Sequence, residues 1–257
     1  MKFKYIDIHS HISFADYGKD QKDVLKRMND LEMATITVGT DLVSSIEAVK
    51  IASENENVFA CIGAHPHDVL DFVFREEDFK GLVQNPKVVA IGECGLDYFK
   101  MIGDIDVEKA RQKNEFIKQI EFAIKYNKAL MLHIRDAYDD AYNILKKYEG
   151  KVRGNIHFFA GSLDWARKFN NLGFTVSFTG VITFADQYDE VVKNIPLNML
   201  HAETDAPYVA PIPYRGKRNE PAYVVETIKR IAEIRGEDFE SVRIQLLDNA
   251  KRVFGIQ

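Results

Sequence analysis

This chain of 257 residues alternates short apolar runs with longer amphipathic stretches along its whole length, and that alternation most restricts how it can fold. The apolar runs predict eight strands, at residues 4–8, 35–38, 58–62, 88–91, 130–133, 155–158, 175–178 and 199–203. The stretches between them predict helices at residues 21–29, 42–54, 76–84, 107–126, 137–148, 163–171, 186–194 and 221–234, and a last helix follows at 239–253. Strands separated by crossover helices run parallel to one another, so the sequence predicts an α/β protein.

Eight strand–helix units predict a (β/α)8 TIM barrel, a fold that ordinarily needs about 250 residues. Hydrophobic residues make up 46% of the sequence, which is enough for a sizeable core, and no Gly- or Ser-rich linker interrupts it. We therefore expect a single domain spanning residues 1–257. An open doubly wound sheet is the alternative, although no G-x-G-x-x-G fingerprint follows the first strand to support a dinucleotide-binding fold.

Histidines are concentrated at the ends of the predicted strands. Two close the first strand, two follow the third, the fifth and the sixth end in one each, and one lies in the eighth: His9, His11, His65, His67, His133, His157 and His201. In a TIM barrel the carboxyl ends of the strands form the active-site face. The sequence thus predicts a group of imidazoles at one mouth of the barrel.

The spacing within the first strand places two of these imidazoles together. His9 and His11 are two residues apart, and alternate side chains of a strand share a face, so both can reach one point. Asp7 lies two residues before His9, on the same face of the strand, and could orient one of the two rings as a hydrogen-bond acceptor.

Two carboxylates follow strands in the same region. Glu93 comes after the fourth strand, and Asp205 comes after the eighth. The predicted eighth strand also contains His201 and Glu203, which are spaced by two from Asp205 and so lie on the same face. They lie deeper along the strand, so we expect core or supporting roles for them. Asp205, at the mouth, is the better candidate for a metal ligand or a general base.

Four histidines and two carboxylates at one mouth point to bound metal. A buried bare carboxylate is unstable, and a metal ion is a common remedy. Mixed nitrogen and oxygen donors suit Zn, Mn or Fe better than Mg, which carboxylates and waters could still hold. Six candidate ligands are too many for one tetrahedral ion, so we expect two divalent metal ions per chain.

The sequence resembles the TatD family of metal-dependent deoxyribonucleases, a branch of the amidohydrolase-like barrels. The resemblance covers essentially the whole chain. It rests on Asp7-x-His9-x-His11, Gly63-x-His65-Pro66-His67, Gly92-Glu93-x-Gly95-Leu96-Asp97-Tyr98, His133-x-Arg135-Asp136, Glu203-Thr204-Asp205-x-Pro207-Tyr208, the run from Arg215 to Pro221, and Asn249-x-x-Arg252-x-Phe254.

The resemblance implies a two-metal centre with His9, His11 and Asp205 on one ion, His133 and His157 on the other, and Glu93 bridging the two. It also implies that His65 lies near the substrate phosphate. The family usually has His-Cys-Phe-Ser-Gly after its sixth strand, whereas this chain has His157-Phe-Phe-Ala-Gly161. Phe158 and Ala160 therefore replace the usual Cys and Ser beside a metal ligand.

The charge pattern indicates how an anionic substrate could be held. The net charge is -5, so nucleic acid would have to be bound by local contacts. Arg215, Lys217 and Arg218 form a basic loop after the last strand, where we expect it to open onto the mouth, and Arg135 closely follows His133. We expect these four cations to contact substrate phosphate. Aromatic side chains of the mouth loops could stack on bases, although loop packing is the simpler explanation for each: Tyr98, Phe99, Tyr208 and Tyr214.

These features predict hydrolysis of phosphate esters. Two divalent ions outweigh the charges of Glu93 and Asp205, and paired ions can activate a water and stabilise the attacking and leaving oxygens. We expect a phosphodiesterase, in particular an exonuclease-like deoxyribonuclease, with Asp205 and Glu93 as its catalytic carboxylates. The alternatives are a small-molecule metallohydrolase acting on a lactone, an amide or a phosphoester, and a non-enzymatic metal-binding scaffold.

We expect no membrane association and no obligatory protein partner. The sequence has no long apolar run of the kind that spans a membrane, and the amino terminus lacks the features of a signal peptide. Cys61 and Cys94 form no C-x-x-C pair, which fits a reducing compartment. These features predict a cytoplasmic protein.

Overall fold

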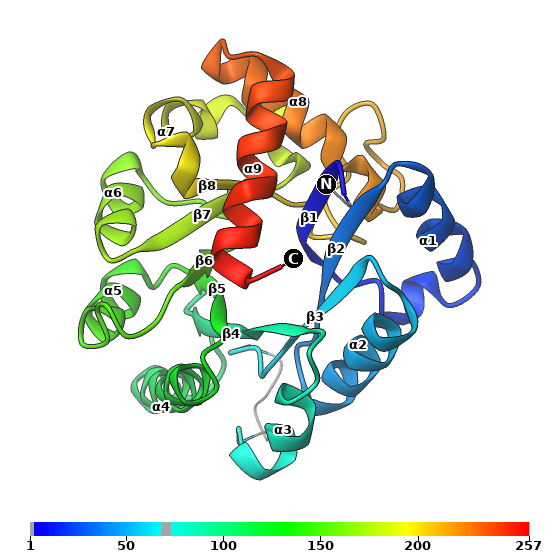
Figure 1. The fold of residues 1–257 in the computed structure, drawn as a ribbon. Helices are drawn as coiled ribbons and strands as arrows, with labels where there is room; N and C mark the ends of the chain where they lie inside the picture. The colour runs from blue at the N-terminus through cyan, green and yellow to red at the C-terminus, as the bar shows by residue number, and fades with distance from the viewer. Residues whose placement is uncertain (1–2, 68–72, 257) are drawn as a thin grey trace.

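The computed structural model describes residues 3–67 and 73–256. One parallel sheet contains all eight predicted strands in sequence order (Figure 1): β1 (Tyr5–Ser10), β2 (Met33–Val38), β3 (Val58–Ile62), β4 (Val88–Asp97), β5 (Ala129–Arg135), β6 (Gly154–Ile156), β7 (Phe174–Phe178) and β8 (Leu200–Ala202). The sheet closes just beyond β8, where the His11 amide donates to the Ala206 carbonyl (2.7 Å) and the Asp205 amide donates to the His9 carbonyl (2.9 Å). The predicted TIM barrel is confirmed.

In the described part of the chain, eight helices surround the sheet (Figure 1): α1 (Gln21–Asp30), α2 (Leu42–Glu54), α3 (Glu76–Val83), α4 (Ile105–Lys125), α5 (Tyr138–Lys146), α6 (Leu163–Asn171), α7 (Asp189–Asn194) and α8 (Val224–Arg235). Local sequence begins several of them. Asp41 and Ser44 form a reciprocal capping box on α2, and Ser162 accepts a hydrogen bond from the Trp165 amide at the start of α6. The predicted helices at 186–194 and 221–234 each begin as a short 3-10 turn, Asp186–Tyr188 and Pro221–Tyr223.

The last helix, α9 (Phe239–Phe254), closes one end of the barrel. It crosses the end that faces the viewer in Figure 1 and packs on β1, β6 and β8. Its apolar side chains, which include Leu247 and Phe254, share a buried cluster with Ile6 and Ala129 at the beginnings of strands. Because α9 covers the amino ends of the strands, their carboxyl ends open at the opposite end of the barrel.

Strand β4 is longer than the predicted strand 88–91, and it carries Glu93 within it. Its register against β5 shifts between Ile91 and Cys94. The chain lies very close to β5 there: a Cβ on Gly92 would lie 2.4 Å from the Met131 carbonyl oxygen, and one on Gly95 would lie 2.0 Å from the His133 carbonyl oxygen. Glycine at these positions therefore lets β4 continue past the irregularity.

The other strand ends differ from prediction by a few residues, with consequences for the site. β6 ends at Ile156 and β8 at Ala202, so His157 and Glu203 lie just after strands rather than within them. β1 extends to Ser10, so His9 lies inside it and His11 directly follows. Among the helices in residues 3–67 and 73–256, none combines the length and apolarity needed to cross a membrane.

Candidate metal centre

The carboxyl ends of the strands surround a cavity of about 580 Å³. Five of the six predicted metal ligands line it, and the sixth, His9, is fully buried directly beneath. His65 and Arg135 also line the cavity, as the sequence predicted for residues near substrate. Aromatic rings complete the wall: Phe14, Tyr138, Phe158, Tyr188 and Tyr208.

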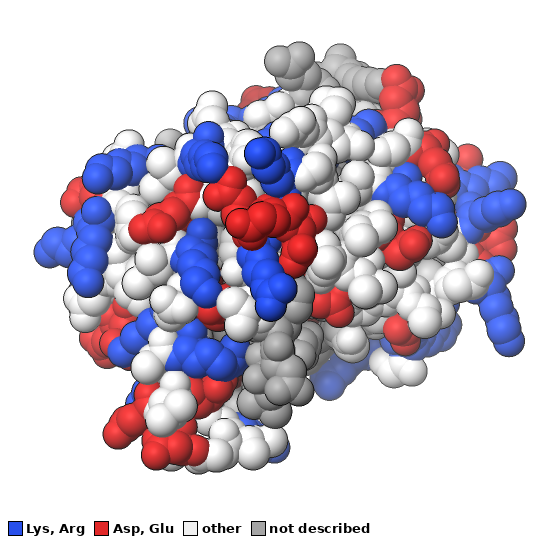
Figure 2. All heavy atoms as spheres, turned by 90° about the horizontal axis from the view of Figure 1, so that it is seen from below, with Lys and Arg blue, Asp and Glu red and all other residues white. Residues whose placement is uncertain are grey.

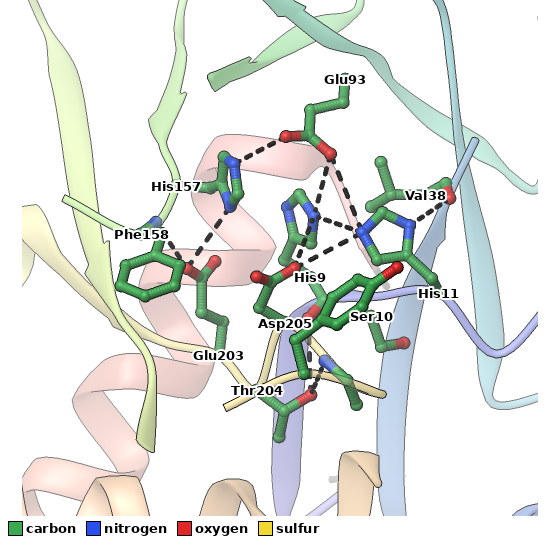
Figure 3. A network of polar contacts seen from close by, with 12 residues as sticks. His9, Ser10, His11, Val38, Glu93, His157, Phe158, Glu203, Thr204 and Asp205 are labelled. Carbon is green, nitrogen blue, oxygen red and sulfur yellow. Dashed lines mark hydrogen bonds and ion pairs between the residues drawn. The ribbon is translucent and has the colours of Figure 1, made fainter. Parts of the chain in front are cut away.

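Four donor atoms converge on one point at the β1 side of the cavity (Figure 3): His9 Nε2, His11 Nε2, Glu93 Oε2 and Asp205 Oδ1. His9 Nε2 lies 3.2 Å from His11 Nε2, 3.4 Å from Glu93 Oε2 and 3.7 Å from Asp205 Oδ1. His11 Nε2 lies 3.4 Å from Asp205 Oδ1 and 3.8 Å from Glu93 Oε2. The His9, His11 and Glu93 donor atoms all lie within 4.8 Å of one another, close enough to hold one metal ion.

A second set of donors lies on the other side of Glu93. Glu93 Oε1 is 2.9 Å from His133 Nδ1 and 2.7 Å from His157 Nε2, and these two nitrogens are 3.2 Å apart. His65 Nε2 lies 3.5 Å from the same oxygen. Three protein donors that meet at a cavity wall leave room for a non-protein ligand, as in catalytic metal sites.

Glu93 faces both sets, one carboxylate oxygen toward each. Its burial opposes ionisation, but the surrounding imidazoles of His157, His65 and His9 hold the pKa of this carboxyl well below its usual range. Asp205 behaves similarly, because hydrogen bonding to His11 and the nearby imidazoles outweigh burial and lower its pKa. Both groups are therefore carboxylates near neutral pH, as metal ligands must be.

The ring nitrogens that face away from the donor sets show how the imidazoles are oriented. His11 Nδ1 donates to the Val38 carbonyl (2.8 Å), which leaves Nε2 as the unprotonated nitrogen. His133 Nε2 meets Asp97 Oδ2 (3.0 Å) and its Nδ1 meets Glu93 Oε1 (2.9 Å), so a metal ion bound at Nδ1 would leave Nε2 to donate to Asp97. His157 Nδ1 faces Glu203 Oε1 at 3.7 Å.

Asp7 does not orient an imidazole, which corrects the sequence-based expectation. Its carboxylate accepts hydrogen bonds from the His9 amide (3.2 Å), the Thr204 amide (2.9 Å) and the Thr204 hydroxyl (2.6 Å). Asp7 therefore ties β1 to the segment after β8, and it places the backbones of His9 and Asp205 rather than their side chains.

His201 and Glu203 lie below the cavity, as their spacing predicted. Glu203 is fully buried, and its two oxygens accept from the Phe158 amide (2.6 Å) and the Ser177 hydroxyl (2.9 Å). Both ring nitrogens of His201 lack a hydrogen-bond partner among the described residues, and burial lowers its pKa to about 3. His201 is thus a neutral core residue packed near Phe254.

The basic loop lies beside the metal cavity rather than in its wall. Arg215, Lys217 and Arg218 are not among the described residues that line the cavity. Arg218 pairs with Asp20 (2.5 Å) at a neighbouring hollow that Lys217 also lines, and the Arg215 guanidinium lies 3.6 Å from the ring centre of Phe184. Asn219, which follows the loop, donates to the carbonyl of Tyr208 (2.6 Å), and Tyr208 lines the cavity, so the loop adjoins the cavity wall.

Of the four aromatic residues considered for stacking, only Tyr208 lines the cavity within the described chain. Tyr98 donates to Asp140 (2.8 Å), and Tyr214 stacks on Tyr223 at 3.7 Å. Phe99 lies under the Arg135 guanidinium, 3.6 Å from its ring centre. The replacement residues Phe158 and Ala160 both line the cavity, so the departure from the family pattern alters its wall.

Sequence reasoning missed Asp97 as a site residue, although it lies in the motif that contains Glu93. The alternation Glu93, Gly95, Asp97 was a usable signal, because residues two apart on a strand share a face. This signal was not used, because the strand was expected to end at residue 91, before Glu93. The contribution of the Val38 carbonyl had no signal, since any residue supplies that group.

Together the fold and these donor sets define a class of protein, the α/β barrels with histidines and carboxylates that could hold metal ions at the carboxyl mouth. Comparison with known proteins identifies the family within this class. The model of the TatD-related DNase family matches residues 6–255. An uncharacterised metal-dependent hydrolase of Bacillus subtilis, YabD, is 39% identical, with 97% of this chain and 98% of that protein covered. The similarly described YcfH of Escherichia coli is 35% identical over 98% and 96%.

Solved structures agree with these relationships. The crystal structure of YJJV, a TatD homologue from Escherichia coli, superposes with a TM-score of 0.91 at 27% identity and full coverage of both chains. A TatD-family hydrolase from Entamoeba histolytica shares the fold, with a TM-score of 0.86 at 21% identity and 99% coverage of each chain. This chain belongs to the TatD family of metal-dependent hydrolases.

Proposed function

We propose that this protein is a deoxyribonuclease that hydrolyses phosphodiester bonds with two divalent metal ions. The observation that carries the proposal is the pair of adjacent donor sets on opposite oxygens of one buried carboxylate, Glu93. The name of the matching family model supports DNA as the substrate. When bound, a pair of divalent ions lowers the pKa of water and stabilises the attacking and leaving oxygens of a displacement.

The residues around the donor sets have separate tasks in this proposal. The ions are held by four neutral imidazoles, those of His9, His11, His133 and His157. Glu93 contributes one carboxylate oxygen to each donor set. Asp205 lies at the cavity wall, is 9% exposed, and accepts the proton of the attacking water as general base. Glu93 is much the weaker base, because it faces both donor sets.

His65 and Arg135 bind the phosphate undergoing attack. Burial and the neighbouring His133 lower the pKa of His65 to about 3, so its imidazole is neutral near pH 7 and can donate a hydrogen bond without adding charge. Arg135 is exposed at the cavity, and its guanidinium is held over the Phe99 ring, where it can contact phosphate oxygens. Together they orient the phosphate toward the ions.

An extended strand would leave the cavity past Tyr208, toward the basic loop. Figure 2 shows one face of the molecule, on which basic and acidic side chains are interspersed rather than segregated. The net charge of -5 also disfavours binding by bulk attraction. We therefore assign the contacts to the next phosphates to Arg215, Lys217 and Arg218, beside the mouth.

One observation favours a second candidate, a hydrolase of small phosphate esters. Tyr138, Phe158 and Tyr188 wall the cavity, whereas the basic loop lies outside it. A substrate that ends at its first phosphate would use the whole cavity and no part of the loop.

Digestion of end-labelled single-stranded DNA by the purified protein tests both candidates. The enzyme is supplied in turn with Mg²⁺, Mn²⁺ or Zn²⁺, and its products are mapped beside those from RNA, an aryl phosphodiester and a panel of lactones. We expect metal-dependent release of nucleotides from DNA that is absent in Glu93→Gln. Intact DNA together with rapid turnover of a small ester or lactone would replace the proposal with the second candidate or with a lactonase.

A further inference from the structure

The two donor sets differ in what stands behind their imidazoles. On the His9 and His11 side, the far nitrogens meet a carbonyl or nothing: His11 Nδ1 bonds to Val38, and His9 Nδ1 has no partner among the described residues. On the other side, the far nitrogen of His133 is hydrogen-bonded to a buried carboxylate, Asp97, at 3.0 Å. The far nitrogen of His157 faces the buried carboxylate of Glu203 at 3.7 Å but has no hydrogen-bond partner among the described residues. Among the described residues, this second side is the one with three protein donors rather than four: Glu93, His133 and His157.

Asp97 is fixed so that one particular oxygen meets His133. It is 3% exposed, and its Oδ1 accepts a hydrogen bond from the Phe99 amide (2.8 Å). The side chain of Gln112 also fixes the backbone of Asp97. It accepts a hydrogen bond from the Asp97 amide and donates one to the Asp97 carbonyl, each at 2.8 Å. With Oδ1 committed to an N–H, Oδ2 is left for His133 Nε2 at 3.0 Å.

We infer that Asp97 is a positioning residue that sets the tautomer of His133 and thereby creates the second metal position. The inference rests on the two-metal centre of the proposed function. His133 presents Nδ1 to Glu93 Oε1 and His157 Nε2, whereas His9, His11 and His157 present Nε2 to their sets. An imidazole binds metal only through its unprotonated nitrogen, so a proton held on Nε2 by Asp97 keeps Nδ1 available.

This geometry makes an unusual prediction for Asp97→Asn. The Phe99 amide must still meet an acceptor, so the new side-chain oxygen takes the Oδ1 place and the amide NH₂ takes the Oδ2 place. Two donors cannot face one another, so His133 Nε2 becomes an acceptor and the ring proton moves to Nδ1, toward the metal position. The isosteric variant therefore blocks the donor atom, whereas Asp97→Ala leaves the ring free to adopt either tautomer.

Glu203→Gln is the matched control, since it also neutralises a buried carboxylate behind an imidazole of the same set. Here the Phe158 amide binds Oε1, which is also the oxygen that faces His157 Nδ1. The amide NH₂ of Gln therefore points toward the Ser177 hydroxyl, which can accept, and an acceptor remains in front of His157. The tautomer of His157 is preserved in this variant.

Two measurements test the inference without any assay of turnover. Metal-free protein is titrated with Zn²⁺ against a competing chelator, and imidazole ¹⁵N NMR of the protein in excess Zn²⁺ reports which ring nitrogen of His133 is protonated. We expect two ions per wild-type chain and protonation of His133 at Nε2. Loss of a partner behind a ligand typically weakens metal binding about 10–100-fold. We expect about 10-fold for one ion in Glu203→Gln and Asp97→Ala, and at least about 100-fold in Asp97→Asn with the proton on Nδ1.

Several outcomes would overturn it. If Asp97→Ala weakens the second ion as much as Asp97→Asn or more, Asp97 acts through the fold rather than through the tautomer. Three ions in wild type that fall to two in both Asp97 variants would make Asp97 a ligand itself, in a set with His65 and His133. An unchanged His133 spectrum in Asp97→Asn contradicts the inference even if that variant binds no metal. Protein that behaves as expected but leaves DNA intact would refute the proposed function alone.

Discussion

Gly95 offers a quantitative test of how β4 and β5 fix the spacing between the two donor sets. We consider Gly95→Ala. An added Cβ would lie 2.0 Å from the His133 carbonyl oxygen, and the backbone φ of 143° lies in a region that only glycine occupies readily. The β5 backbone would have to move by about 1 Å or more to restore ordinary contact, and it carries His133.

The expected destabilisation follows from these two effects. A strained backbone conformation costs about 1–3 kcal/mol, and overpacking a core contact costs about 1–3 kcal/mol. Their sum, about 2–6 kcal/mol, lowers the melting temperature of a chain of this size by at least about 4 °C. The same displacement separates His133 from Glu93, so Gly95→Ala should also lose affinity for one of its two ions.

Thermal unfolding of the metal-free protein, followed by circular dichroism, measures the first effect, and zinc titration measures the second. Gly81→Ala is the control: a Cβ there meets no atom within 4 Å, and alanine favours helix, so this variant should be as stable as wild type or slightly more so. A Gly95→Ala protein with the melting temperature of the control and both ions bound would refute the reasoning.

Four further predictions follow from the site. Asp205→Asn should keep its metal under excess metal yet turn over DNA at least about 100-fold more slowly, because an amide is no general base; near-normal turnover would exclude that role. His133→Ala should lose one ion of two by metal analysis, and a variant that keeps both would exclude His133 as a ligand. Lys217→Ala should reduce the salt dependence of DNA turnover and leave an aryl phosphodiester unaffected; equal loss on both substrates would place its effect elsewhere. His201 has its pKa lowered from 6.5 to about 3, so the unfolded state takes up its proton first and stability falls as the pH drops from about 6.5 to about 3. His201→Leu should reduce that fall in acid-unfolding measurements, and an unchanged profile would argue against a neutral buried imidazole.

The architecture and the clustering of histidines and carboxylates could be predicted from the sequence because both depend on local patterns. Apolar periodicity located all eight strands, and the histidines at the strand ends gather at one mouth of the barrel. Strand ends were less predictable, since they depend on neighbouring chains. β4 continues to Asp97 only because Gly92 and Gly95 allow close approach to β5, a contact between residues about 40 positions apart in the sequence.

The hydrogen-bond partners of the candidate ligands were harder to predict than the cluster that those candidates form. Asp7 and His9 are two residues apart on a strand, so the sequence placed them on the same face. The Asp7 carboxylate instead accepts hydrogen bonds from backbone amides and from the Thr204 hydroxyl, because those donors lie across the closure of the barrel. The position of the basic loop likewise depends on Asn219, whose side chain bonds to the carbonyls of Thr204 and Tyr208. Such contacts join segments whose proximity no local pattern reveals.

The polar interior on one side of the barrel is best explained by the donor set above it. From β1 and β2, Ile6, Ile8 and Ile36 contribute to the apolar cluster that α9 covers. Beneath β6 to β8 the interior contains Asn155, Ser177 and Glu203, joined by hydrogen bonds of 2.7 Å from Asn155 to Ser177 and 2.9 Å from Ser177 to Glu203. A buried carboxylate needs donors, and the two polar residues below supply them in sequence. Above these hydrogen bonds, Glu203 Oε1 faces His157 Nδ1 at 3.7 Å. Ser177→Ala removes a donor to Glu203, so we expect it to weaken the binding of the second ion without changing any predicted ligand.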